Sequence, residues 1–203
     1  MKPQTQSDQG KTVPGLRERK KARTKAAIQR EAVRLFREQG YSATTIEQIA
    51  EAAEVAPSTV FRYFATKQDL VFSHDYDLPF AMMFQAQSPD LTPIQAERQA
   101  IRSMLKDITE QELALQRERF VLILSEPELW GASLGNISQT MQLLGEQVAK
   151  RAGRDPGDPA VRAYTGALFG VMLQVSLDWA NDPEMDFAAT LDEALYCLED
   201  LRP

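Results

Sequence analysis

Long segments without glycine or proline constrain this chain more than any other feature. Neither residue occurs from Leu16 to Gln39 or from Ile94 to Glu126. In the first segment, apolar side chains recur at the spacing of one helical face, at Ile28, Ala32, Leu35 and Phe36. No segment alternates apolar and polar residues as a half-buried strand does. We therefore predict an all-α fold of about nine helices.

Two short helices are predicted after the first long one. Residues Thr44–Glu47 fit a capping box, in which a hydroxyl and a carboxylate satisfy two backbone amides, and an Ala-rich helix follows. Pro57 suits the first position of a second short helix that continues to Phe64, because no N–H is needed there.

The rest of the chain is punctuated into further helices. Residues Thr66–Asp69 repeat the cap pattern and predict a fourth helix that runs to Gln85, with a kink at Pro79. The segment 94–126 is either one helix or two that break near Ile108. Turns at 127–131 and 153–159 separate the last predicted helices, at 134–151, 160–180 and 187–201.

The charges divide the chain into two unlike parts. The formal net charge of the whole chain is −6. Residues 1–67 hold 13 Lys+Arg and 7 Asp+Glu, whereas residues 68–203 hold 10 and 22. Six of the basic residues fall between Arg17 and Lys25, where only Glu18 opposes them. A solvated helix face carries such a run too, but a basic head on an acidic body favours a protein that meets a polyanion with one end.

Composition excludes several classes of site. The chain is 43% apolar, as in soluble globular proteins, and it has one cysteine, Cys197, and one histidine, His74. A disulfide scaffold and a thiolate zinc cluster are therefore excluded, and a Ser-His-Asp triad is poorly supplied. We find no Gly-rich phosphate loop and no paired acid and base, so we expect neither an enzyme nor a cofactor. The start of the chain lacks the apolar core of a signal peptide, which predicts a cytoplasmic protein.

A long helix followed by two short helices and a tight turn is the arrangement of a helix-turn-helix. The second short helix would enter the major groove with polar side chains reaching outward, namely Ser58, Thr59, Arg62 and Tyr63. Val60, and partly Phe61 and Phe64, would turn inward. Spacing alone leaves a second interpretation open, a three-helix corner of an ordinary helical protein.

Three groups of residues bear on this choice: Phe36…Gly40-Tyr41…Thr44-Thr45-Ile46, then Ile49-Ala50…Ala53…Val55, then Thr59…Phe61…Tyr63-Phe64…Lys67. In this combination, residues 15–72 resemble the DNA-binding domain of the TetR family of bacterial transcriptional regulators nearly throughout. We accordingly divide the chain into a mobile arm at 1–14, a helix-turn-helix domain at 15–66, and a helical effector-binding and dimerisation domain at 67–203.

The resemblance implies DNA contacts residue by residue. Thr45, Tyr63 and Lys67 match positions that usually bind phosphates. The positions that face the groove are matched by Pro57, Ser58, Thr59, Phe61 and Arg62. Arg62 would either pair bidentately with guanine, worth roughly 1 to 3 kcal/mol of discrimination, or bind another phosphate. Basic residues of the first helix, including Arg17, Lys20 and Lys21, would follow the DNA backbone or enter the minor groove.

One departure from the family pattern concerns Ala56, which stands where many members place a Ser or Thr cap before the recognition helix. The missing cap costs about 1 kcal/mol of local helix stability. Pro57 at the first helical position offsets part of that cost.

Residues 163–177 contain no charge and include Gly166 and Gly170. A helix so apolar is either the centre of a monomeric core or is shared with a second subunit. The resemblance implies the second, with a homodimer formed by the last two helices and a palindromic operator. The interface residues that we predict are Gly166, Gly170, Leu191, Leu195 and Leu198. Cys197, beside this stripe, is interpreted as a buried small apolar residue.

Core packing explains most of the large apolar side chains beyond residue 79. The resemblance implies that some of them line a cavity for an unidentified small apolar or amphipathic effector, and the candidates are Phe84, Met104, Phe120, Trp130, Met141 and Met172. His74 is either part of an exposed polar patch or a contact for a metal or a ligand. The expected function is a dimeric repressor that a small molecule releases from operator DNA, with no membrane partner. An activator, an effector-independent regulator and an architectural protein remain open alternatives.

Overall fold

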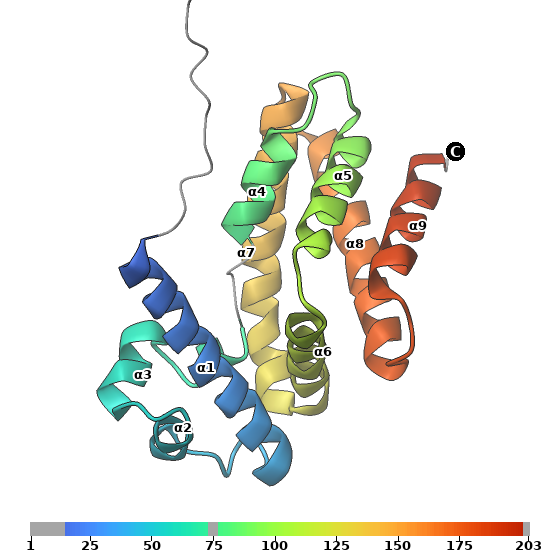
Figure 1. Cartoon of the computed structure of the whole chain (residues 1–203). Coiled ribbons are helices and arrows are strands. Elements are labelled where there is room, and N and C mark those ends of the chain that lie inside the picture. Colours follow the sequence, from blue (N-terminus) through green and yellow to red (C-terminus); the bar gives the residue numbers. More distant parts are fainter. Residues whose placement is uncertain (1–14, 73–76, 201–203) are drawn as a thin grey trace, which may run out of the picture.

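The computed structural model describes residues 15–72 and 77–200, and this part of the chain holds nine α-helices, one 3-10 helix and no strand. The helices are α1 (Leu16–Gln39), α2 (Ile46–Ala52), α3 (Pro57–Tyr63), η1 (Gln68–Leu70), α4 (Asp77–Gln85), α5 (Pro93–Lys106), α6 (Glu110–Ser125), α7 (Pro127–Ala152), α8 (Pro159–Asn181) and α9 (Phe187–Asp200). Residues 15–72 form a head, and residues 77–200 form a body beside it, whose helices other than α6 stand roughly upright in this view (Figure 1). The predicted all-α fold is confirmed.

The first helix is as predicted from its period. Its inward face is buried at Ile28, Ala32, Val33 and Phe36. It ends at Gly40, whose φ of 91° lies in a region that residues other than glycine rarely adopt. The Gly40 N–H donates to the Phe36 carbonyl at 3.0 Å. The breaker read from the sequence therefore ends the helix at the expected residue.

The capping box of α2 begins one residue later than predicted. Thr45 is the N-cap: its hydroxyl accepts from the Gln48 N–H at 3.2 Å, and the Thr45 N–H donates to the Gln48 side chain at 2.8 Å. Thr44, 1% exposed, donates its hydroxyl to the Gly40 carbonyl at 2.8 Å. Because Thr44 is used to close the loop, the helix starts at the next threonine.

The predicted fourth helix is wrong in its extent. Thr66 and Asp69 form the reciprocal cap, with bonds of 2.8 and 3.2 Å, but it opens only the short η1. Leu70 and Val71, both 0% exposed, then turn into the head core instead of continuing a helix. Pro79 is the third residue of α4, where a missing N–H breaks no helical bond, so it starts the helix and does not kink it. His74 lies outside the described residues.

The long segment 94–126 breaks into α5 and α6 at 107–109, where Thr109 and Glu112 form a capping box. The predicted start of the next helix at residue 134 is wrong, because α7 begins at Pro127 and includes Gly131. Pro127 occupies the favoured first position. Leu129, 0% exposed, adds packing that offsets the poor helix propensity of the glycine.

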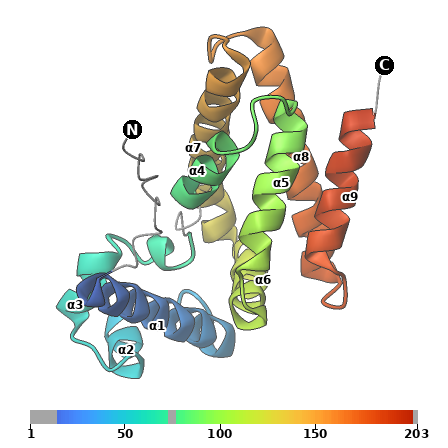
Figure 2. The same cartoon turned by 45° about the horizontal axis from the view of Figure 1, so that its top comes forward.

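Two apolar cores hold the fold together. The head core gathers Phe36, Tyr41 and Val60, and it is completed by Leu122 from α6 and Leu129 from α7. The body core is built from α4, α5, α7, α8 and α9. Helix α1 contacts α6, whose lower end lies near α1 in Figure 2. The head is thus joined to the body through α6 and α7 as well as through the chain itself.

Candidate nucleic-acid interface

The start of α1 and the end of α3 come together on one surface. A concave region of about 700 Å³ is lined by Arg17, Glu18, Lys20, Lys21, Thr24, Arg62 and Tyr63. Five of these seven residues were predicted to contact DNA from two segments that are forty residues apart in the sequence. The fold therefore places the basic run of α1 directly beside the recognition helix, which sequence spacing alone did not show.

The recognition helix α3 presents most of its predicted groove-facing side chains to solvent. Pro57, Ser58, Phe61 and Arg62 are exposed, and Thr59 is half-buried. Val60 packs into the head core at 0% exposed, as predicted. Phe61 is 55% exposed, so the expectation that it turns partly inward is wrong. Phe64, one turn further on, fills that space at 4% exposed.

The start of α3 has the predicted weakness. Ala56 is its N-cap, makes no side-chain cap bond, and precedes Pro57 at the first helical position. The preceding turn holds Glu54 at φ 55°, the one positive φ of a non-glycine residue in the described part of the chain. The Val55 N–H donates to the Ala50 carbonyl at 2.9 Å and closes this turn. The helix therefore depends on the turn and on Pro57 for its start.

Arg62 and Tyr63 form a pair at the edge of the basic surface. The Arg62 guanidinium lies 5.2 Å from the centre of the Tyr63 ring, a cation–π distance. Arg62 is exposed, so a guanidinium in this position is accessible to a base edge or a phosphate. Tyr63 itself is half-buried.

Lys67, which was predicted to bind a phosphate, makes several contacts within the head. Its ammonium donates to the Tyr41 carbonyl, and it lies 4.3 Å from the Tyr41 ring centre and 5.6 Å from that of Phe36. The pKa of Lys67 is lowered, mainly by burial. Burial and nearby carboxylates raise the pKa of Tyr41 to about 12. Lys67 thus fastens η1 to the end of α1, and only its remaining N–H groups are available to a phosphate.

Helix α6 joins the head to the body through two arginines, which sequence analysis missed. Arg119, 6% exposed, donates to the Val71 carbonyl at 2.6 Å. Two residues earlier, Arg117 donates to the carbonyls of Trp179 and Ala180 at the end of α8, at 2.8 and 2.7 Å. A movement of α8 relative to the head therefore strains one of these two attachments.

Surface contacts add to this joint. Arg37 pairs with Glu118, and Gln68 donates to Glu128 at 3.3 Å. No sequence signal indicated this joint, because Arg117 and Arg119 stand in a polar run with Gln116 and Glu118.

The predicted effector residues do not converge on one cavity. Phe84 is fully buried beside Phe80, with ring centres 6.2 Å apart, while Met104, Phe120 and Met172 are half-buried. Trp130 is 45% exposed on α7, so its predicted place in a cavity is wrong. In the described chain its side chain lies on the outer face of that helix.

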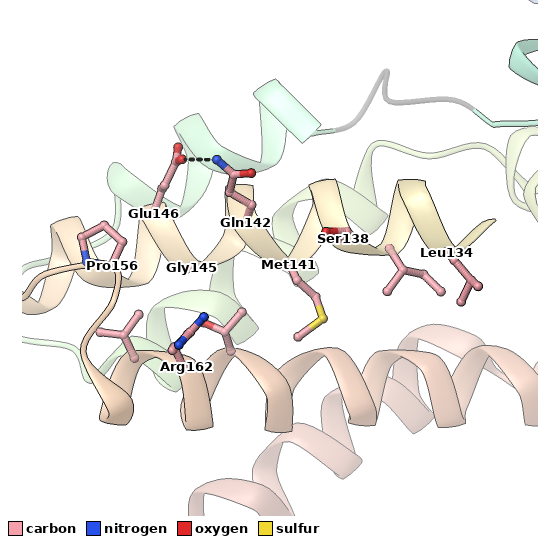
Figure 3. Close-up of a pocket in the computed structure, with 11 residues that line it drawn as sticks. Leu134, Ser138, Met141, Gln142, Gly145, Glu146, Pro156 and Arg162 are labelled. Carbon is pink, nitrogen blue, oxygen red and sulfur yellow. Dashed lines mark hydrogen bonds between the residues drawn. The ribbon is translucent and has the colours of Figure 1, made fainter. Parts of the chain in front are cut away.

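Met141 does line a hollow, a groove of about 540 Å³ between α7 and α8. Figure 3 shows the Met141 side chain between the two helices and the 3.2 Å hydrogen bond from Gln142 to Glu146 on its rim. Leu134, 65% exposed, continues the apolar wall along α7. This groove is open to solvent along the outer side of the body.

A buried carboxyl group in the body was also missed. Glu97 of α5 is 0% exposed, and neither carboxylate oxygen has a hydrogen-bond partner. Burial raises its pKa to about 8. The neighbouring Arg98 turns the other way, to Asp192 of α9 at 3.2 Å and to Glu199 at 3.3 Å.

The predicted dimer residues fall into two groups. Leu191 and Leu195 are 3% and 0% exposed within this chain, so they belong to its own core and are not free for a partner; the prediction is wrong for both. Gly170 is exposed, and Gly166 and Leu198 are half-buried. Cys197 is exposed, not buried as predicted, because α9 turns Leu195 and Leu198 inward instead.

Comparison with known proteins identifies the family. Residues 28–73 match the family description "Bacterial regulatory proteins, tetR family", and residues 91–203 match "MftR C-terminal domain". The chain is 34% identical over 198 residues to the HTH-type transcriptional regulator TcmR of Streptomyces glaucescens, covering 94% of this chain and 88% of TcmR. The chain belongs to the TetR family. It is therefore a helix-turn-helix DNA-binding transcriptional regulator and not an enzyme, as the sequence predicted.

Solved TetR-family structures share the fold. NalD of Pseudomonas aeruginosa, described as the secondary repressor of the MexAB-OprM multidrug efflux pump, is 25% identical with a TM-score of 0.61, covering 88% of this chain and 94% of NalD. The complex of SmeT of Stenotrophomonas maltophilia with triclosan is 21% identical with a TM-score of 0.58, covering 86% and 91%. At that identity, the second comparison shows the fold alone.

Proposed function

We propose that the protein is a homodimeric repressor that binds a palindromic operator and leaves it when a small molecule binds the body. One observation supports DNA binding most strongly: Arg17, Lys20 and Lys21 share a surface with Arg62. A helix that reads bases and a basic run that neutralises phosphates must act together, and here they adjoin.

The roles of the DNA-contacting residues follow from their exposure. Arg62 and Ser58 read base edges, and Phe61, exposed on the same helix, makes apolar contact in the groove. Thr45, Tyr63 and the remaining N–H groups of Lys67 bind phosphates, and the α1 basic residues supply salt-dependent affinity.

The exposed face of α8 supports the dimer. Helix α8 is long and apolar enough to cross a membrane, with a mean hydropathy of 1.2 over its most apolar stretch, yet only 22% of that stretch is buried in this chain. Ala163, Ala167 and Gly170 lie on this face, and a Cβ built on Gly170 meets nothing within 4 Å. No contact within this chain requires these residues to be small. Small side chains here would allow a second α8 to approach closely.

The proposed response to an effector depends on the contacts that join the head to the body. Ligand binding that displaces α8 or α6 acts on the Arg117 and Arg119 attachments and so on the separation of the two heads. The ligand must bind the state that does not fit DNA more tightly than the state that does. SmeT with its triclosan shows a protein of this fold holding a small molecule.

Selection of bound DNA from a random pool tests the proposal. We expect enrichment of one palindrome by the full chain, with affinity that falls steeply as salt rises. A pool in which no sequence is enriched would contradict the proposal. Enrichment of a single unpaired half-site would retain the head but exclude the dimeric reading.

Substitutions then assign the contacts. Arg62→Ala should lose preference at one base position, whereas Lys67→Ala should weaken all base-substituted operators alike. Arg154→Ala, an exposed arginine at the far end of the body, is the matched control and should change neither. Equal losses across the operator set for both head variants would remove the base-reading role of Arg62.

A further inference from the structure

Glu97 occupies a core position that a carboxyl group normally avoids. It lies on the inward face of α5 with Ile94 and Ile101, which are 6% and 3% exposed, at helical spacings of three and four residues. Both of its oxygens are buried and unpartnered. A carboxylate in such surroundings is strongly disfavoured unless a donor or a cation reaches it.

Other unpartnered polar groups lie on the helices that build the body core. Seven buried side-chain atoms in the described chain lack a hydrogen-bond partner, and five of them belong to Glu97, Arg151, Tyr164 and Thr165 on α5, α7 and α8. The pKa of Tyr164 is raised by burial first and by the Glu97 carboxyl second, so the two groups interact. Tyr164, Met83 and Met172 all pack against the body core.

The cations nearby are engaged elsewhere. Arg98 is bound to Asp192 and Glu199 of α9. Arg151 donates to the carbonyls of Phe84 and Leu91 at 3.4 and 3.3 Å, and its guanidinium lies 5.5 Å from the centre of the Phe84 ring. Neither arginine hydrogen-bonds to the Glu97 carboxyl, whose pKa is raised by burial. The carboxyl group therefore remains an unused acceptor.

We propose that Glu97 and Tyr164 are the polar anchor of the effector site, and that the effector is a mainly apolar molecule that presents a hydroxyl or amine donor to Glu97. This inference rests on the effector-responsive function proposed above. An anionic group is disfavoured at this point, because it would be buried in an apolar core whose nearby arginines are already bound elsewhere. The half-buried Met83 and Met172 supply adaptable walls that yield to a ligand.

Three matched probes test the chemistry: phenylbutanol, phenylbutylamine and phenylbutyrate, which share an apolar part and differ in the polar group. With the full-length dimer, the alcohol and the amine should raise Tm and release the selected operator, and the carboxylate should do neither. Binding of phenylbutyrate as tightly as the other two, or binding of none of the three, would overturn the inference.

Substitutions locate the site. Glu97→Leu should raise Tm without probe, since it removes an unpartnered buried carboxyl, and should weaken alcohol and amine binding about ten-fold or more, the value of one good hydrogen bond. A carboxyl with a purely structural role predicts the reverse, a lower Tm and unchanged probe binding. Glu97→Gln separates the two donors, because the neutral amide should retain the alcohol and lose the amine.

Glu146→Leu is the matched control, because Glu146 lines the open groove between α7 and α8. It should leave probe affinity unchanged, and loss of binding there with retention in Glu97→Leu would move the site to the groove and overturn the inference. Operator affinity without probe is measured for every variant. A protein that binds operator but no probe refutes this inference alone, whereas one that enriches no operator refutes the proposed function.

Discussion

The head and the body bury polar groups in different ways. In the head, Thr44 bonds the Gly40 carbonyl and Arg119 bonds the Val71 carbonyl, so buried donors hold the backbone in place, although one side-chain atom each of Gln29 and Tyr41 is buried there without a partner. In the body, Glu97 and Tyr164 are buried with no partner. A bonded buried donor fixes the packing around it, whereas an unpartnered buried carboxyl leaves a hydrogen bond to be completed. This difference fits the proposal that the head binds DNA and that the body binds a ligand.

The largest effect should come from Leu129, which lies in the body sequence but packs in the head core. Leu129→Ala should cost about 2 to 5 kcal/mol, as for other fully buried leucines. Amide exchange should then speed up in α1–α3. Leu168→Ala, equally buried in the body core, should instead speed exchange in α5 and α8. If both variants affect the same amides, the two cores form one cooperative unit and the contrast fails.

The pH dependence of stability should reflect Glu97. Its pKa is about 8 in the folded state against an ordinary 4.5, so the folded protein keeps a proton that the unfolded chain loses between these values. Stability should therefore fall as pH rises through this window, on the order of 1 kcal/mol per pH unit.

Urea unfolding of wild type and Glu97→Leu across that range measures the effect. The slope should vanish in the variant. Glu112 and Asp192 have lowered pKa values, so their contributions are lost only in more acidic solution, as pH falls. A slope that persists without Glu97 would point to another buried acid.

A smaller effect on stability and association is expected from a substitution on the exposed surface of α8. Gly170→Ala fits the isolated chain without contact and should stabilise the helix by about 1 kcal/mol through propensity. In the proposed dimer the added methyl group should also weaken association. Urea unfolding measures the stability and sedimentation over a dilution series measures the association, and a stabilised chain with unchanged dimerisation would place the interface elsewhere.

The smallest effect concerns the head. Ala56→Ser restores a side-chain cap to α3 and should add about 1 kcal/mol of stability. Thermal unfolding compares it with Ala53→Ser, a change of the same kind at the C-cap of α2 that lacks this role. Equal Tm changes in the two variants would show that capping does not limit α3.

Local patterns predicted the head well and the body less well. Period, caps and Gly40 located α1 to α3 because their signals lie within a few residues. The fourth helix failed because Leu70 and Val71 are drawn into a core that no local pattern shows. Leu191 and Leu195 were wrongly assigned to a dimer interface, because an apolar stripe on a helix does not indicate whether its own chain or a partner covers it. Glu97 was missed because a lone glutamate in an amphipathic helix looks like a surface residue.

The central claim is that a rigid head is held at a fixed distance from its copy by the body. The most direct measurement is operator affinity after insertion of about five base pairs, half a helical turn, between the half-sites. The insertion turns one half-site to the opposite face of the duplex, so affinity should fall to that of a single half-site. A further insertion to a full turn should restore correct facing but not spacing. Undiminished affinity after the half-turn insertion would contradict the claim.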